Sequence, residues 1–202
     1  MKILRIDASA RVEGSRSREV AELIEKKLLQ LHPDAEVVVR DIINKPIPHI
    51  THAEIEAFET TQPLTDAQKP LVQFSDELID ELLAADILLL SVPMYNFSMP
   101  SAFKAYIDHI VRVGKTFSYE EQGVIGLVEG KKCYIATALG GVYTGTKFEP
   151  MNFLTGYLQG LLGFLGIVDV EVFQLEGTDL DVDGLPERKQ TLMAQIDSIQ
   201  AK

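Results

Sequence analysis

Residues 92–99, read VPMYNFSM, combine a side-chain amide with two aromatic rings and a thioether directly after an apolar run. Asn96 can both donate and accept hydrogen bonds, while Met94, Tyr95 and Phe97 offer a flat apolar wall. This mixture suits a planar heterocycle with a polar edge, and a flavin is one such ligand. The alternative is a turn whose aromatic side chains fill the core. These eight residues alone do not decide between the two.

A second polar loop, residues 9–17 (SARVEGSRS), carries three hydroxyl side chains: Ser9, Ser15 and Ser17. These hydroxyls, together with the amides at the start of the following helix, could hold a phosphate group. A helix N-terminus attracts anions, each contact contributing about 0.3–1 kcal/mol. Three arginines lie in or beside the loop and could assist: Arg11, Arg16 and Arg18. For any single serine, a solvated loop with an N-cap is the simpler interpretation, but the cluster favours phosphate.

Motifs that the sequence lacks narrow the chemistry further. No GxGxxG follows the first predicted strand, and no GxxxxGK[ST] occurs, so neither a dinucleotide fingerprint nor a P-loop is supported. Among the four histidines only His49 and His52 form a close pair, and no third ligand stands beside them, so we expect no metal site. Hydrolase motifs such as GxSxG and HExxH are absent too.

Composition indicates one domain, residues 1–202, because 202 residues of which 46% are hydrophobic can bury one sizeable core. The formal charge of −11 disfavours nucleic acid and anionic membranes as partners. No secretory signal is visible at the start, and Cys133 is the single cysteine, which is consistent with the cytoplasm. We expect Cys133 to fill the core. The apolar residues 151–168 predict a buried helix rather than a membrane span.

The elements that must position these loops alternate between strand and helix. Apolar runs predict five strands, at residues 2–8, 35–42, 86–92, 132–139 and 168–175. Helical spacing predicts major helices at residues 17–31, 101–113, 152–165 and 185–199, and a short helix at 51–58. A further long helix is predicted to begin at a capping box at residues 65–68 and to end at residue 84. Ser17 is expected to be the N-cap of the first helix. Pro100 is expected to be the first residue of the helix that follows the loop at 93–99. Residues 116–131 predict a hairpin or flap.

This alternation predicts an α/β protein with a flavodoxin-like, doubly wound, five-stranded parallel sheet in the order 2-1-3-4-5 and helices on both faces. Three loops then meet at the carboxyl edge of the sheet: residues 9–17, 93–99 and 138–144. The third loop contains a glycine pair, Gly140 and Gly141, that lets backbone amides approach a ligand closely. Tyr143, just beyond, could orient a substrate or donate a proton, or could be a simple surface aromatic.

The serines of the first loop, PMYNF at 93–97 and the glycine pair at 140–141 together resemble a known family. It is that of the FMN-dependent NADH:quinone oxidoreductases, also called azoreductases and formerly described as acyl carrier protein phosphodiesterases. Further similar segments are TDAQ at 65–68, SDEL at 75–78, GKK at 130–132 and GFLGI at 163–167. The resemblance therefore runs nearly from end to end.

The resemblance implies a role for each loop. Ser9, Ser15 and Ser17, with the backbone of Arg16, would hold the FMN phosphate. The isoalloxazine ring would lie along Pro93, Met94, Tyr95, Asn96 and Phe97, with its pyrimidine side at Ala138, Leu139, Gly140 and Gly141. In the family a serine and an arginine are common where this chain has Ala138 and Leu139. Family members are homodimers with flavin sites at the interface, and Phe117 and Tyr119 would shape the partner's pocket.

The implied activity is transfer of two electrons from NADH or NADPH to quinones, and reductive cleavage of azo compounds, in a ping-pong cycle. FMN carries that chemistry, so no side chain needs to act as acid, base or nucleophile. One alternative is a flavodoxin-like electron carrier that uses the same loops. Against it, the hairpin and the apolar helix at 152–165 indicate an interface that a monomeric carrier does not need. A third possibility is an NAD(P)H-binding regulator that holds no flavin.

Overall fold

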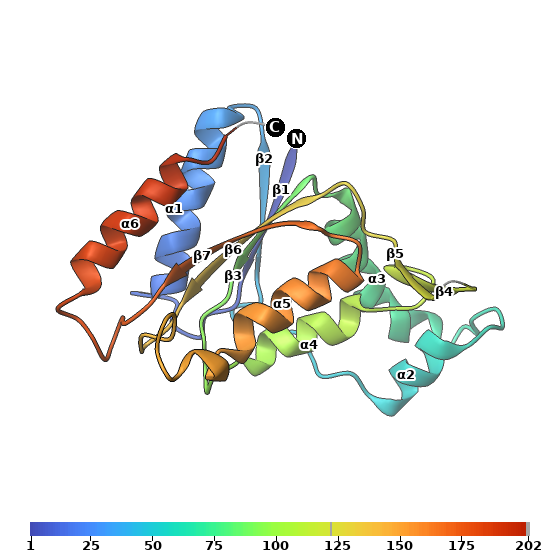
Figure 1. Ribbon diagram of the computed structural model, residues 1–202. Helices are drawn as coiled ribbons and strands as arrows, with labels where there is room; N and C mark the ends of the chain where they lie inside the picture. Colours follow the sequence, from blue (N-terminus) through green and yellow to red (C-terminus); the bar gives the residue numbers. More distant parts are fainter. Residues whose placement is uncertain (122, 201–202) are drawn as a thin grey trace.

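A parallel sheet of five strands organises the computed structural model, which describes residues 1–121 and 123–200 (Figure 1). The strands are β1 (Lys2–Asp7), β2 (Glu36–Asp41), β3 (Ile87–Ser91), β6 (Lys132–Ala138) and β7 (Asp169–Leu175). Their spatial order is β2-β1-β3-β6-β7, and each neighbouring pair is parallel. The predicted order 2-1-3-4-5 is therefore confirmed, since β4 and β5 form a separate hairpin.

Helices connect the strands: α1 (Arg16–Leu31), α2 (His52–Glu59), α3 (Lys69–Ala84), α4 (Ser101–Ile110), α5 (Phe153–Phe164) and α6 (Leu185–Asp197). A single 3-10 turn, Glu149–Met151, precedes α5. Figure 1 shows α1 and α6 on one side of the sheet and α3, α4 and α5 on the other. The buried side chains divide in the same way, because successive residues of a strand point to opposite faces. Ile3 belongs to the cluster under α1 and α6, whereas Leu4 and Ile6 belong to the other.

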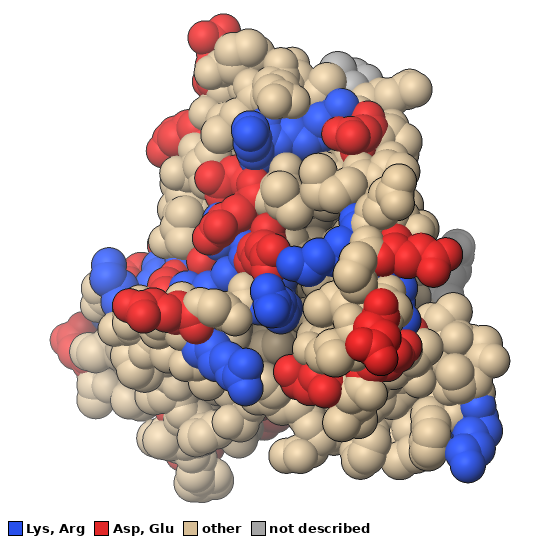
Figure 2. Space-filling view, turned by 90° about the vertical axis from the view of Figure 1, so that its left-hand side faces the viewer, with Lys and Arg blue, Asp and Glu red and all other residues tan. Residues whose placement is uncertain are grey.

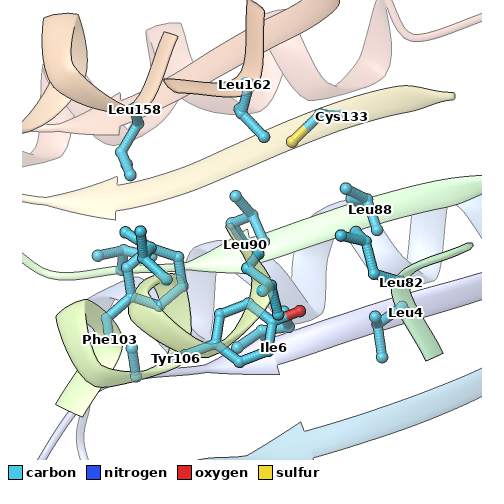
Figure 3. Close-up of a cluster of buried hydrophobic side chains, with 14 of the residues drawn as sticks. Leu4, Ile6, Leu82, Leu88, Leu90, Phe103, Tyr106, Cys133, Leu158 and Leu162 are labelled. Carbon is cyan, nitrogen blue, oxygen red and sulfur yellow. The ribbon is translucent and has the colours of Figure 1, made fainter. Parts of the chain in front are cut away.

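The larger cluster places side chains of three helices against the middle of the sheet. In Figure 3, Leu158 and Leu162 of α5 reach toward Cys133 of β6, and Tyr106 of α4 lies among the leucines below. Every residue of β3 is buried, as the continuous apolar run predicts. The Cys133 side chain is fully buried, and that burial raises the pKa of its thiol. Cys133 is thus a core residue, as expected, and not a reactive thiol.

Three predicted helix starts differ slightly in the structure. Ser15, not Ser17, is the N-cap of α1, because its side-chain oxygen accepts a hydrogen bond from the Arg18 amide at 3.4 Å. Pro100 is the residue before α4 rather than its first residue, and the helix begins at Ser101. The capping-box segment at 65–68 forms a turn just before α3, whose first turn tolerates Pro70.

The predicted hairpin is present as β4 (Phe117–Glu120) and β5 (Gly123–Gly126), and it packs beside the end of α5. The ring centroids of Phe117 and Phe164 are 4.8 Å apart. The helix predicted at residues 151–168 is present as α5, but the prediction that it is buried holds for one stripe only: Leu154, Leu158 and Leu162. Phe153, Tyr157 and Phe164 are exposed instead. Within residues 1–121 and 123–200, no helix has the length and apolar character required to span a membrane.

Candidate active site

A cavity of about 260 Å³ opens where the loops after β1, β3, β6 and β7 meet. Its lining brings together most of the predicted cofactor-binding residues: Ser9, Ser15, Arg16, Ser17, Pro93, Met94, Tyr95, Ala138 and Gly140. Asn96, Phe97, Leu139 and Gly141 lie in the same loops but are not lining residues. The carboxyl edge of a doubly wound sheet is where such proteins bind ligands. The three predicted loops therefore converge on one site.

The loop after β1 presents a cluster of donors at the N-terminus of α1. The Ser15 and Ser17 hydroxyl oxygens are 3.3 Å apart, and the Ser91 hydroxyl donates to Ser17 at 3.5 Å. The amides of Arg16 and Ser17 lie in the first turn and have no hydrogen-bond partner among the described residues. Two free amides, neighbouring hydroxyls and the positive end of a helix dipole are groups that favour an anion such as phosphate.

Arg18 fixes the position of this loop through buried hydrogen bonds. Its guanidinium is largely buried and donates to Asp41 at 2.7 Å, to Asp7 at 3.4 Å and to the backbone carbonyl of Ser9 at 3.1 Å. Arg18 does not line the cavity, and its two terminal nitrogens donate to the two carboxylates and the loop carbonyl, so the structure shows it supporting the loop rather than facing the cavity. Arg11 does line the cavity, and Arg16 pairs with Glu19 at 3.0 Å.

The pKa of Asp41 shows the electrostatic effect of the buried Arg18 guanidinium. Burial alone would raise the pKa of the Asp41 carboxyl. The hydrogen bonds from Arg18 and from the amides of Asn44 and Ile43 outweigh burial and lower that pKa to about 2. The carboxylate is thus ionised throughout the neutral range, and folding and ionisation of Asp41 are coupled.

The loop after β3 forms a tight turn with an unusual backbone. Tyr95 and Ser98 exchange two backbone hydrogen bonds of 2.8 and 3.0 Å. Between them Asn96 has φ +48° and Phe97 has φ +70°, the left-handed pair of a type I′ turn. Asparagine and glycine usually occupy such positions, so a bulky Phe97 there is strained. Phe97 and Tyr95 are exposed, and the alternative that these aromatics fill the core is wrong.

Two contacts tie this turn to its surroundings. The Tyr95 hydroxyl accepts from the Ala10 amide at 3.2 Å and lies 3.5 Å from the Ser9 hydroxyl, so it joins the first two loops. The Phe97 carbonyl accepts from the amide of Phe153, at the start of α5, at 3.1 Å. The cavity wall formed by Met94 and Tyr95 is therefore fixed from both sides.

The glycine loop is held by the segment that follows β7. The carbonyls of Leu139, Gly140 and Gly141 accept from the amides of Thr178, Asp179 and Gly177 at 3.1, 3.1 and 2.9 Å respectively. Within the described residues, the amides of Gly140 and Gly141 have no hydrogen-bond partner. A Cβ at Gly140 would lie 3.0 Å from Oδ2 of Asp179, so the loop fits closely only without a side chain. Free amides thus remain at this end of the cavity.

Sequence reasoning missed Thr178 and Asp179, which also line the cavity. One signal could have found them: the segment directly follows the fifth predicted strand, whose carboxyl end must reach the same edge of the sheet. Tyr143 is partly buried, and its Cε2 lies 3.5 Å from the position of a Cβ on Gly141. Phe117 and Tyr119 lie in the hairpin beside Phe164, away from the lining of this chain's own cavity.

The surface beside these loops carries charges of both signs. Figure 2 shows Lys and Arg side chains interspersed with Asp and Glu on the side of the molecule that bears α6. Part of this arrangement is the pairing of Lys189 with Glu19 at 2.9 Å and of Arg188 with Asp181 at 2.8 Å. The anion site therefore depends on local donors and not on a broad basic surface on this face.

A doubly wound parallel sheet in the order β2-β1-β3-β6-β7, with a cavity at the carboxyl edge of its strands, is the arrangement of the flavodoxin-like class of α/β proteins. A family model described as "Flavodoxin-like fold" matches residues 1–201.

Proteins named FMN-dependent NADH:quinone oxidoreductase are similar along most of the chain. The one from Azospirillum brasilense is 40% identical over 98% of this chain and 97% of its own length. The one from Xanthobacter autotrophicus is 45% identical over 84% and 83%. The crystal structure of an azoreductase from Bacillus anthracis str. Sterne is 26% identical, with a TM-score of 0.90 over 98% of this chain and 97% of that one. The chain belongs to the family of FMN-dependent NADH:quinone oxidoreductases.

The depressed pKa of Asp41 generates a prediction about acid stability. The contribution of Asp41 is fully present above the ordinary carboxyl pKa near 4 and is lost as the pH falls toward 2. We expect Asp41→Asn to lower the free energy of unfolding by about 2 kcal/mol at pH 7. This difference should shrink between pH 4 and pH 2. Urea unfolding at several pH values measures it.

Asp66→Asn is the matched control, because Asp66 is an almost fully exposed carboxylate beside Lys69. It should change the unfolding free energy by no more than about 0.5 kcal/mol at any pH. A pH-independent difference between wild type and Asp41→Asn would contradict the assignment of that coupling to Asp41.

Proposed function

We propose that the chain is a single FMN-binding domain, residues 1–202, that transfers two electrons from NADH or NADPH to quinones and cleaves azo compounds reductively in a ping-pong cycle. The observation that carries the proposal is one cavity with free amides at both ends: those of Arg16 and Ser17 and those of Gly140 and Gly141. The names of the relatives from Azospirillum and Xanthobacter support the cofactor and the donor.

The residues present fit FMN at each part of the molecule. The phosphate, an anion, suits the hydroxyls of Ser9, Ser15 and Ser17 and the N-terminus of α1. The polar edge of the ring suits the amides of the glycine loop, and the ring face suits the wall formed by Met94 and Tyr95. Ala138 also lines the cavity, and Asn96 and Phe97 are exposed in the turn that follows Met94 and Tyr95.

When bound, FMN supplies the redox chemistry, since it accepts a hydride from a nicotinamide and passes the electrons to an acceptor. The chain's own groups hold and orient the reactants. The amides of Gly140 and Gly141, which have no hydrogen-bond partner among the described residues, would donate to the edge of the bound ring and stabilise negative charge there. Met94 and Tyr95 would exclude water from one face of the bound ring, and Tyr143, whose ring lies beside Gly141, would orient the acceptor. No side chain of the cavity is required as a nucleophile.

A homodimer is part of the proposal, with flavin sites at its interface. Exposed apolar side chains run along α5 and the hairpin: Phe153, Tyr157, Phe164, Tyr119, Val124, Ile125 and Leu127. Exposed apolar side chains gathered on neighbouring elements are typical of a protein–protein interface. This patch continues to the cavity through the Phe97–Phe153 hydrogen bond. In the dimer, Phe117 and Tyr119 would shape the partner's pocket, and we place the enzyme in the cytoplasm.

The rival function is a flavodoxin-like carrier that exchanges single electrons with protein partners. It would use the same cavity, but the apolar face of α5 would then remain uncovered in a monomer. A monomeric protein that binds FMN yet reacts slowly with NADH and NADPH would favour the carrier. A regulator that binds NAD(P)H alone predicts a chain with no affinity for FMN.

The absorption spectrum of the FMN-loaded protein tests the function directly. Under anaerobic conditions, NADH or NADPH should bleach the yellow colour, and benzoquinone should restore it. Loss of colour reports electron transfer from the nicotinamide, and its return reports transfer to the quinone. Absence of bleaching with both nicotinamides would overturn the proposed function.

A variant of the anion site tests how the phosphate is held. We expect Ser17→Ala to weaken FMN binding by about 1 kcal/mol, or about fivefold in Kd, through the loss of one hydroxyl hydrogen bond. Fluorescence titration of FMN measures this change. Ser198→Ala is the control, since Ser198 lies exposed at the end of α6. An unchanged Kd in Ser17→Ala would remove Ser17 from the phosphate site.

The oligomeric state tests the dimer. Tyr157→Glu places a charge in the apolar face of α5 and should convert a dimer of twice 22.4 kDa into a monomer. Light scattering after gel filtration measures the mass. Leu83→Glu, an exposed position on α3, is the control and should leave the dimer intact. A wild-type protein that is monomeric at micromolar concentration would contradict the dimer.

A further inference from the structure

Glu176 is a buried carboxylate directly after β7, with only 6% of its surface exposed. No ion pair reaches its carboxylate within the described residues. Arg188 donates to the Glu176 backbone carbonyl instead, at 2.9 Å, and pairs with Asp181. Burying a charge without a cation costs several kcal/mol unless hydrogen bonds compensate for the lost water. The hydrogen-bond donors that surround the Glu176 carboxylate therefore indicate its role.

Three of the donors belong to one short segment. The Tyr143 amide donates to Glu176 at 3.1 Å, the Thr144 amide at 3.2 Å and the Thr144 hydroxyl at 2.8 Å. The side-chain amide of Gln174 donates to the same carboxylate. An ionised carboxylate only accepts hydrogen bonds, so these donors match its lone pairs. Glu176 thus fixes the backbone at Tyr143 and Thr144, immediately after the glycine pair.

The hydrogen bonds of Glu176 continue through Gln174 to the start of α5, which contacts the turn after β3. The side-chain oxygen of Gln174 accepts from the Thr155 hydroxyl at 3.0 Å and from the Asn152 amide group at 3.3 Å, at the N-terminus of α5. The next residue, Phe153, donates its backbone amide to Phe97 in the turn after β3. Glu176 therefore connects the segment of Tyr143 with the loop that carries the apolar wall.

The groups proposed to hold FMN are fixed by other contacts. Arg18 braces the anion site, and the backbone of residues 177–179 holds the carbonyls of the glycine loop. Among the described residues, the segment beyond Gly141, with the ring of Tyr143 beside that glycine, donates its backbone amides directly to the Glu176 carboxylate, whereas the wall of Met94 and Tyr95 is reached only indirectly, through Gln174 and the start of α5. Loss of this carboxylate should move Tyr143 and leave the two sets of free amides in place.

We propose that Glu176 is a positioning residue for the electron acceptor: it holds Tyr143 beside Gly141 and thereby sets the binding of the quinone without setting the binding of FMN. This inference rests on the proposed function. In Glu176→Gln one of the two acceptor oxygens becomes an NH2 donor, which would face the amide of Tyr143 or Thr144 as one donor facing another. The segment would therefore lose part of its anchor while the size of the side chain stays the same.

Hydrogen exchange in the protein without FMN tests the anchor itself. In Glu176→Gln the amides of Tyr143 and Thr144 should exchange at least about tenfold faster than in the wild type. Glu149→Gln is the matched control, because Glu149 accepts from the Gly145 amide of the same loop at 2.7 Å but is exposed. It should affect exchange at Gly145 alone. Unchanged exchange at Tyr143 and Thr144 in Glu176→Gln would overturn the proposal.

Kinetics test the consequence for the acceptor. At saturating NADH, Glu176→Gln should raise the KM for benzoquinone about tenfold, while the Kd for FMN stays within about twofold. In a Tyr143→Ala background the same substitution should raise that KM no further, because the ring it positions is gone. Equal effects in both backgrounds, or a weakened FMN affinity without a KM change, would overturn the positioning role.

The two proposals fail in different ways. A wild-type protein that binds FMN but does not pass electrons from NADH or NADPH to benzoquinone overturns the proposed function. An active wild type with an unaltered Glu176→Gln variant overturns only the role of Glu176. If Glu176→Gln does not fold, Thr144→Val is the alternative: it removes the hydroxyl that donates to Glu176 and accepts from Gln174, and it should raise the KM for benzoquinone in the same direction. An unchanged KM in Thr144→Val would then count against the role of Glu176.

Discussion

The rest of the site depends on the hydrogen bonds and ion pairs of one buried group, the guanidinium of Arg18. It reaches Asp7 at the end of β1, Asp41 at the end of β2 and the carbonyl of Ser9 in the loop between β1 and α1. Arg5 adds a second contact to Asp7 at 3.0 Å. Because a buried charge must be compensated, these groups hold two strand ends and the start of α1 in one arrangement. The free amides of the anion site take their positions from it.

The sheet could be predicted from the sequence because its signals are local. Continuous apolar runs such as residues 87–91 mark buried parallel strands, and their alternation with helices leaves few topologies open. The helix start was harder. Ser15 and Ser17 both satisfy the pattern of an N-cap, and only the hydrogen bond to the Arg18 amide selects Ser15. The burial of Arg18 could not be predicted from the sequence, because its two carboxylate partners, Asp7 and Asp41, are 34 positions apart in the chain.

Two parts of the site escaped prediction for a different reason. The apolar composition of α5 predicted burial, yet the sheet covers only the stripe around Leu158. Composition does not distinguish a face covered by the chain's own sheet from one available to a second copy. Thr178 and Asp179 escaped because their segment has no motif, and its importance lies in backbone hydrogen bonds to the glycine loop. Backbone contacts of this kind depend on topology and leave little trace in residue type.

The strained turn after β3 shows how the cavity and the apolar face of α5 constrain each other. A glycine at position 97 would adopt φ +70° without strain, whereas Phe97 is bulky. Its carbonyl nevertheless accepts from Phe153, and its ring is exposed beside the apolar residues of α5. Phe97 thus lies both in the turn that carries Met94 and Tyr95 of the cavity wall and at the surface proposed as the dimer interface. Strain at such a position persists only where the surrounding contacts compensate for it, so the arrangement of the site and the covering of α5 are linked through this turn.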